Sequence, residues 1–194
     1  MVSKKKLLYI CDLVKLYKMK NIITLGGSSS KNSINKQLAE YVGSTVKSVK
    51  VNMLDLNDYQ LPLFSVDIEN EQGFPKDLQN LNKSVEEADG IVLSLAEHNG
   101  AYSAAFKNAF DWLSRIEGKV WRNKPMLLLS TSPGARGGQS VMEIALSRFP
   151  FNGGNIIGSM SFPSFGENFK DGSVINEELN DKLIDLVEQF SKEI

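Results

Sequence analysis

Apolar and polar positions along the chain alternate between short apolar runs and longer segments in which apolar residues recur every three or four positions. Short runs of this kind indicate buried β-strands, and the longer segments indicate amphipathic helices. The run 91–95 is continuously apolar apart from one serine, which favours a central strand covered on both faces. The predicted strands lie at 21–25, 49–54, 91–95, 125–130 and 155–160, and the predicted helices at 33–47, 74–88, 103–115, 139–148 and 176–191.

Strands and helices therefore alternate along the whole chain, which predicts an α/β fold with a doubly wound, five-stranded parallel sheet and helices on both faces. Residues 59–65 have no clear period, and we expect a loop there whose apolar side chains pack on the body of the domain. In sheets of this kind, ligands bind outside the carboxyl ends of the strands, near the point where the strand order reverses.

The stretch 21–39 joins the first predicted strand to the first predicted helix through two glycines and a cluster of hydroxyl and amide side chains. Glycines let the backbone turn and approach a ligand closely, and a helix N-terminus presents unpaired N–H groups that favour an anion. The same residue types also form helix caps and turns. The stretch has neither the Gly-Lys-Ser/Thr of a Walker loop nor the third glycine of the dinucleotide fingerprint, so a phosphate there would be held by hydroxyls and backbone.

Two further polar loops that contain glycine follow predicted strands, at 96–102 and 131–138. Since the carboxyl ends of parallel strands meet at one edge of the sheet, we expect these loops to converge with the turn at 26–35. The convergence predicts one ligand site built from all three.

Composition sets few further limits. The chain has 194 residues, is 42% hydrophobic and has a net charge of -1, which is ordinary for one globular α/β domain and gives no reason to expect a nucleic-acid or membrane partner. Its single cysteine, Cys11, excludes an intrachain disulfide and fits a reducing cytoplasm. We expect a cytoplasmic protein without a metal site.

The first eighteen residues imitate the start of a signal peptide, with three lysines followed by apolar residues. Asp12 and Lys15 interrupt the apolar part, and no small-residue cleavage site follows. The stretch is too short and too charged to span a membrane. Because Met19 stands just before the first strand, we expect a domain at 19–194 and an extension outside the fold at 1–18.

In their order and spacing, these motifs resemble those of the NAD(P)H-dependent FMN reductases, and the resemblance runs from Met19 almost to the C-terminus. The family's Gly-Ser-x-Arg-x-x-Ser-x-Asn is matched by residues 27–35, and its Asp-Leu-x-x-x-x-Leu-Pro by residues 55–62. Its Pro-Glu-Tyr-Asn-Gly is similar to residues 96–100, its Leu-Lys-Asn-Ala-x-Asp-Trp to 106–112, and its Ser-x-Gly-x-x-Gly-Gly to 132–138.

The resemblance implies a flavodoxin-like, three-layer α/β/α sandwich that binds FMN and takes NADPH or NADH as co-substrate. Hydride would pass to the flavin and electrons onward to FMN, a quinone, an azo dye or a similar acceptor, with no catalytic side chain required. It also implies a homodimer or a homotetramer. The phosphate would be held by Ser28, Ser30, Ser33 and Asn35, and the ring bordered by Glu97, His98, Asn99, Gly100, Ser132, Gly134, Arg136 and Gly137. The expected cofactor-binding set also includes Gly27, Ile34, Ala96, Pro133 and Gly138.

The chain departs from the family pattern at three of these positions: Ser30 replaces a frequent Arg, Ala96 a Pro and His98 a Tyr. Several motif residues also have a purely structural interpretation. Trp112 would lie in the core or at a subunit interface, Glu97 would cap the next turn, and Lys107 and Asp111 would form a helix-surface pair. Two other functions remain open, an electron carrier of flavodoxin type without nicotinamide turnover and a flavin-free regulatory domain.

Overall fold

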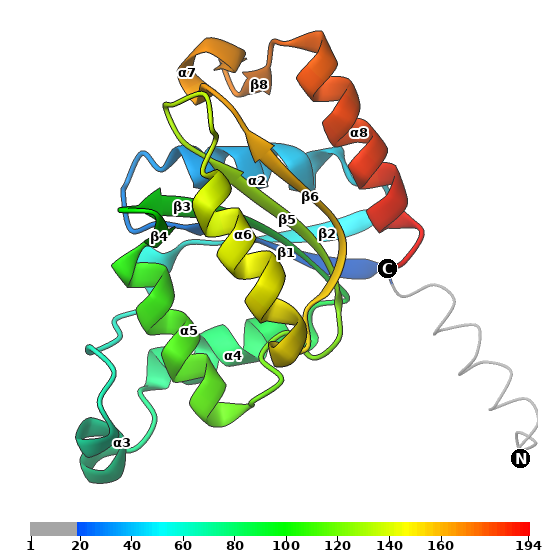
Figure 1. Ribbon diagram of the computed structural model, residues 1–194. Helices are drawn as coiled ribbons and strands as arrows, with labels where there is room; N and C mark the ends of the chain where they lie inside the picture. Colours follow the sequence, from blue (N-terminus) through cyan, green and yellow to red (C-terminus); the bar gives the residue numbers. More distant parts are fainter. Residues whose placement is uncertain (1–18) are drawn as a thin grey trace, which may run out of the picture.

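The computed structural model describes residues 19–194, and the predicted extension 1–18 lies outside the described residues. Five long strands form the body of one sheet (Figure 1). They are β1 (Lys20–Gly27), β2 (Val49–Leu54), β3 (Gly90–His98), β5 (Pro125–Thr131) and β6 (Asn155–Phe162). The long helices are α2 (Ile34–Thr45), α4 (Lys76–Glu87), α5 (Ala104–Ile116), α6 (Gln139–Arg148) and α8 (Glu177–Ser191). The short elements are α3 (Val66–Gln72), β4 (Ala101–Tyr102), α7 (Phe165–Asn168), β7 (Phe169–Lys170), β8 (Ser173–Val174) and two 3-10 turns, Leu56–Asp58 and Phe149–Asn152.

The five long strands are parallel and lie in the order β2-β1-β3-β5-β6. Counted along the chain this is 2-1-3-4-5, the order of flavodoxin-like folds. The predicted fold class and the five-stranded parallel sheet are therefore confirmed. The order reverses between β1 and β3, which makes the carboxyl ends of these two strands the expected place for a ligand.

Helices cover both faces of the sheet, with α2 and α8 on one face and α4, α5 and α6 on the other (Figure 1). The position of the central strand β3 explains why residues 91–95 are apolar apart from Ser94. Ile91, Leu93 and Leu95 pack in the core beneath α4, α5 and α6, whereas Val92 packs in the core beneath α2 and α8. Successive side chains of a strand point to opposite faces, so a strand between two helical layers needs apolar residues at every position.

The expected packing of the apolar side chains in the loop at 59–65 is observed for three residues but not for Leu63, which is exposed. Tyr59, Leu61 and Phe64 pack against the core, and the Phe64 ring meets Trp112 edge to face at 5.0 Å between centroids. Asn108 and Trp112 hold this loop, because the side-chain Oδ1 of Asn108 accepts from the Phe64 N–H at 2.8 Å and the Trp112 indole donates to the backbone carbonyl of Pro62 at 2.8 Å. Trp112 is fully buried, which confirms the core interpretation.

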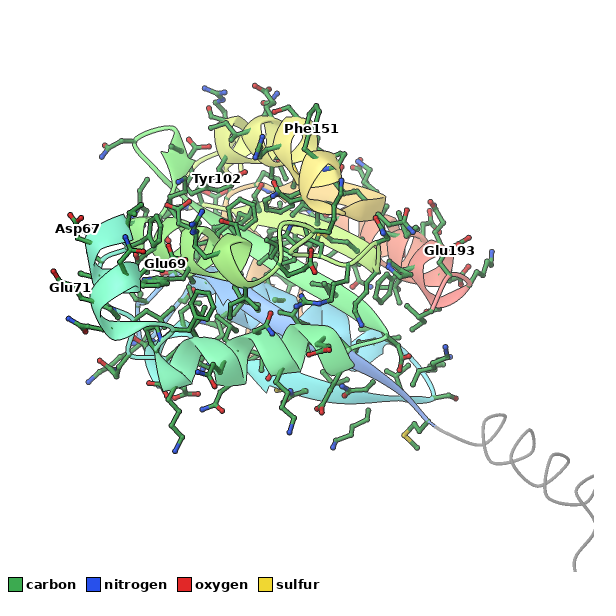
Figure 2. The ribbon with its side chains drawn as sticks, turned by 90° about the horizontal axis from the view of Figure 1, so that it is seen from below. Asp67, Glu69, Glu71, Tyr102, Phe151 and Glu193 are labelled. Atoms are coloured by element: carbon green, nitrogen blue, oxygen red, sulfur yellow. The ribbon has the colours of Figure 1, made fainter. Side chains whose placement is uncertain are left out.

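The sequence pattern missed helix α3, which projects from the body beyond α4 and α5 (Figure 1). Asp67 and Glu71 stand on its outer side and Glu69 faces the body (Figure 2), where it accepts a hydrogen bond from Arg115 at 2.8 Å. None of its residues is buried. None of the helices within residues 19–194 is long and apolar enough to cross a bilayer.

Candidate functional site

A cavity of about 190 Å³ opens where β1, β3 and β5 end. All three predicted loops contribute to its wall, so the expected convergence is observed. Of the predicted residues, those in the wall are Ser28, Ser30, Ser33, Ile34, Asn35, Ala96, Glu97, His98, Ser132 and Pro133. Asn32 and Thr131 also line it, and both lie inside the predicted loops although neither was among the predicted site residues. The predicted residues outside the wall are Gly27, Asn99, Gly100, Gly134, Arg136, Gly137 and Gly138.

The first loop brings two buried hydroxyls to the N-terminus of α2. Ser33 is the N-cap, and its Oγ accepts from the backbone N–H of Lys36 at 3.1 Å. The Oγ of Ser28 accepts from the N–H of Ser30 at 3.2 Å. A hydroxyl that accepts one bond still has its own proton to donate. Together with the positive end of the helix dipole, these protons make the turn suitable for an anion.

The two glycines before this turn do not have positive φ angles. The constraint at Gly26 is space, since a Cβ there would lie 2.5 Å from the backbone nitrogen of Lys36. Glycine at this position therefore lets α2 pack directly on the end of β1. A Cβ at Gly27 would instead meet the Leu95 side chain at 3.2 Å, a contact that a small shift relieves.

Lys36 lies close in sequence to this turn but is held away from it. Its Nζ forms an ion pair with Asp55 at 2.5 Å and lies 4.0 Å from Glu40. The hydrogen bond to Asp55 raises the pKa of Lys36. Burial opposes ionisation of Asp55, but the hydrogen bonds from Lys36 and Asn57 outweigh it and hold the pKa of this carboxyl below its usual value. The cavity wall itself contains no Lys or Arg among the described residues.

This pair predicts a pH dependence of stability. Because the pKa of Asp55 is lower in the folded chain, its ionised form stabilises the fold above about pH 4, and the contribution is lost as the pH falls through the folded-state pKa. We expect Asp55→Asn to lower the free energy of unfolding by about 1 kcal/mol near neutral pH. Urea unfolding at several pH values should show the difference from the native chain shrinking below about pH 4.

The control for this prediction is Asp185→Asn, which removes an exposed carboxylate on α8. It should change the free energy of unfolding by no more than about 0.5 kcal/mol at any of these pH values. A deficit in Asp55→Asn that stayed constant down to acid pH would show that the ion pair is not its cause.

The second loop is a β-hairpin, so the predicted loop at 96–102 needs correction. Strand β3 continues to His98 and pairs with the antiparallel strand β4. Asn99 and Gly100 form the turn with φ angles of 51° and 76°, as a type I′ turn requires at both positions. This regular structure holds Ala96 and Glu97 in the cavity wall and leaves His98 exposed at its rim.

Glu97 caps a helix, although a different one from the next turn that the sequence suggested. Its Oε2 accepts from the backbone N–H of Val141, in the first turn of α6, at 3.0 Å. The N-cap residue of α6 is Gly138, which has no side chain to perform this function. The carboxylate therefore satisfies a free N–H group and opposes the positive helix end.

The third loop contributes Ser132 and Pro133 to the cavity, while Gly137 packs against β6. A Cβ at Gly137 would lie 2.5 Å from the carbonyl oxygen of Phe162 in β6. The exposed Arg136 donates to Ser140 at 3.2 Å and is not part of the wall. The predicted surface pair of Lys107 and Asp111 on α5 is confirmed, with 2.7 Å between Nζ and Oδ2.

Each pair of loops is joined by a hydrogen bond from one side chain. Asn35 at the start of α2 binds the backbone of Thr131, the first residue of the third loop, and Glu97 of the hairpin binds α6 directly after that loop. Ser103, the N-cap of α5 directly after the hairpin, donates to the carbonyl of Gly27 at 2.7 Å. The three loops are thus linked in a closed ring, which fixes the shape of the cavity before a ligand binds.

Comparison with known proteins finds a matching family model and several similar reductases. The family model described as NADPH-dependent FMN reductase matches residues 20–166. A quinone reductase of Escherichia coli (strain K12) is 35% identical over 118 residues, which are 60% of this chain and 62% of that protein. An NADPH:quinone oxidoreductase of Arabidopsis thaliana is 32% identical over 123 residues, 61% of each chain. These matches thus span less than two thirds of each relative's length.

Among solved structures, the chain is similar to FerB, a flavoenzyme NAD(P)H:(acceptor) oxidoreductase from Paracoccus denitrificans. The TM-score is 0.72 at 25% sequence identity, and the similarity covers 90% of this chain and 96% of the other.

Proposed function

The chain belongs to the NADPH-dependent FMN reductase family, and we propose that it is an NAD(P)H-dependent flavin oxidoreductase. It would bind FMN, take NADPH or NADH as co-substrate and reduce FMN, a quinone, an azo compound or a similar small acceptor. The observation that carries the proposal is the convergence of the loops after β1, β3 and β5 on one shared cavity. This is the ligand position that the strand order of the sheet favours.

The residues present fit a flavin mononucleotide. Ser28, Ser30 and Ser33 offer hydroxyl protons beside the N-terminus of α2, where a phosphate finds donors and a favourable dipole. The hairpin at 96–100 and the third loop at 132–138 would border the ring. A cavity of about 190 Å³ is smaller than the 300–1,000 Å³ of pockets that enclose whole ligands, so much of the flavin would lie over the rim.

An exposed rim suits a reaction in which two substrates reach the same flavin face in turn. When bound, the flavin supplies the redox chemistry, accepting a hydride from the nicotinamide and returning electrons to the acceptor. The task of this chain is to hold the phosphate, orient the ring and leave one face open. No acid or base of the cavity wall is assigned a catalytic step.

The test is a two-step spectroscopic titration of the purified, FMN-loaded protein without oxygen. Adding NADPH, or NADH in a parallel sample, should bleach the flavin absorbance, and a quinone should then restore it. Free FMN at the same concentration is the control for direct reaction. If neither NADPH nor NADH changes the spectrum of the bound flavin, the proposed enzyme activity is wrong. That result would favour an electron carrier of flavodoxin type.

We also propose the assembly that the resemblance implies, a homodimer or a homotetramer in the cytoplasm. Exposed apolar side chains support an interaction surface around α3, where Leu63 is 80%, Val66 54% and Phe74 40% exposed. Their segment projects from the body of the domain (Figure 1). The single cysteine of the chain supports the reducing compartment.

A further inference from the structure

The side chain of Asn35 is buried and makes three hydrogen bonds to other parts of the protein. It is the second residue of α2 and is 2% exposed. Its Nδ2 donates to the carbonyl of Thr131 at 3.1 Å, and its Oδ1 accepts from the N–H of Thr131 at 3.0 Å. The hydroxyl of Ser94, on β3, donates to the same Oδ1 at 2.7 Å. One amide thus ties helix α2 to the middle of β3 and to the end of β5.

These bonds leave the side chain little capacity for a phosphate. A side-chain amide has two donor hydrogens and an oxygen with two lone pairs. In Asn35 both lone pairs and one hydrogen are used, so at most one donor remains. The hydroxyls of Ser28 and Ser33 differ, because they accept from the backbone and keep their protons for an anion. Family resemblance places Asn35 among the phosphate ligands, but its contacts describe another task.

The position of Thr131 indicates what the Asn35 side chain does. This residue ends β5 and lines the cavity directly before Ser132 and Pro133. Asn35 pairs with both backbone groups of Thr131, as a neighbouring strand would. The amide therefore fixes where the third loop begins relative to the helix end that faces the first loop.

We propose that Asn35 is a positioning residue of the flavin site, which sets the third loop at the ring end against the turn at the phosphate end. The inference rests on the proposed function and deepens it. Loss of the amide leaves two buried backbone groups of Thr131 without partners, and the loop start can then shift. Since this shift displaces the residues that border the ring, it should weaken the binding of both FMN and riboflavin, although riboflavin has no phosphate.

The experiment compares FMN and riboflavin binding to Asn35→Ala and to the native chain by titration of flavin fluorescence. We expect both dissociation constants to rise by about tenfold or more, from the unpaired Thr131 groups, with a changed absorption spectrum of the bound flavin. Ser30→Ala, a cavity hydroxyl at the phosphate end, is the matched control. Ser30→Ala should weaken the binding of FMN but not of riboflavin, and it should leave the absorption spectrum of the bound flavin unchanged.

Ser94→Ala is the second variant, for the case in which Asn35→Ala does not fold. Ser94 is fully buried and does not line the cavity. A few-fold loss of affinity for both flavins in Ser94→Ala therefore supports positioning through Asn35. Loss of FMN alone in the folded Asn35→Ala variant would make the residue a phosphate ligand and overturn the inference. Unchanged binding of both flavins would show that Asn35 only stabilises the fold, and this result would overturn the inference as well. If the native chain binds neither flavin, the proposed function itself fails.

Discussion

Replacing Ser28 and Ser33 together by alanine is expected to weaken FMN binding by about 10²–10⁴-fold. Each hydroxyl can donate a charge-assisted hydrogen bond to the phosphate, and such bonds contribute about 1.5–3 kcal/mol each. Both side chains are buried in the wall of the cavity beside the N-terminus of α2. Flavin retained after gel filtration and a fluorescence titration with FMN measure the effect.

The double variant also loses the N-cap of α2, which stabilises the helix by about 1 kcal/mol. Riboflavin separates the two effects, because a lost phosphate contact leaves its affinity unchanged. The matched control is Ser44→Ala with Ser147→Ala, two exposed helix serines whose hydroxyls bond only to backbone carbonyls. Unaltered FMN affinity in a folded Ser28→Ala, Ser33→Ala variant would show that the phosphate does not bind at this turn.

Sequence periodicity was sufficient for the long elements of the fold because burial imposes it directly. Helix α4 buries Leu78, Leu81 and Val85, and these three residues carry the pattern from which the helix was predicted. Strand β3 lies between two helical layers, and its apolar run predicts that position. Where one face of a helix or strand packs against the core, apolar residues recur in the sequence with the period of that element.

Elements that bury little were missed for the same reason. Helix α3 has no buried residue and so no apolar stripe, although Ser65 caps its start and Gly73 its end. The hairpin of β3 and β4 had a usable signal in Asn99-Gly100, since this dipeptide favours a type I′ turn. The polar, loop-like composition of the residues around this dipeptide conceals the short strand that follows it.

The location of the site was predictable and the orientation of its side chains was not. Parallel strand ends bring the three loops together in any fold of this class. Whether a polar side chain faces the cavity or another element depends on partners far away in sequence. Asn35 meets Thr131, Glu97 meets Val141, and neither distance along the chain is visible in a motif. For the same reason, motif residues described as ligands can be cross-links between loops.

Replacing Gly137 by alanine is expected to cause the largest loss of stability in the site, about 2–5 kcal/mol. A Cβ there would lie 2.5 Å from the carbonyl oxygen and 2.6 Å from the carbonyl carbon of Phe162, which are backbone atoms of β6 that cannot rotate away. Overpacking of this kind costs about 1–3 kcal/mol. The φ of +59° adds about 1–2 kcal/mol for any residue with a Cβ. Calorimetry should show a Tm lower by roughly 10 °C.

Gly134→Ala is the matched control, three residues earlier in the same loop. Its φ is not positive, and the nearest atom to an added Cβ is Oγ of Ser132 at 3.8 Å. That variant should keep the stability of the native chain within about 0.5 kcal/mol. Equal Tm values for the two variants would mean that the third loop is not pressed against β6. A low Tm for Gly137→Ala alone would establish that glycine at 137 is required by packing on Phe162, whatever ligand the loop borders.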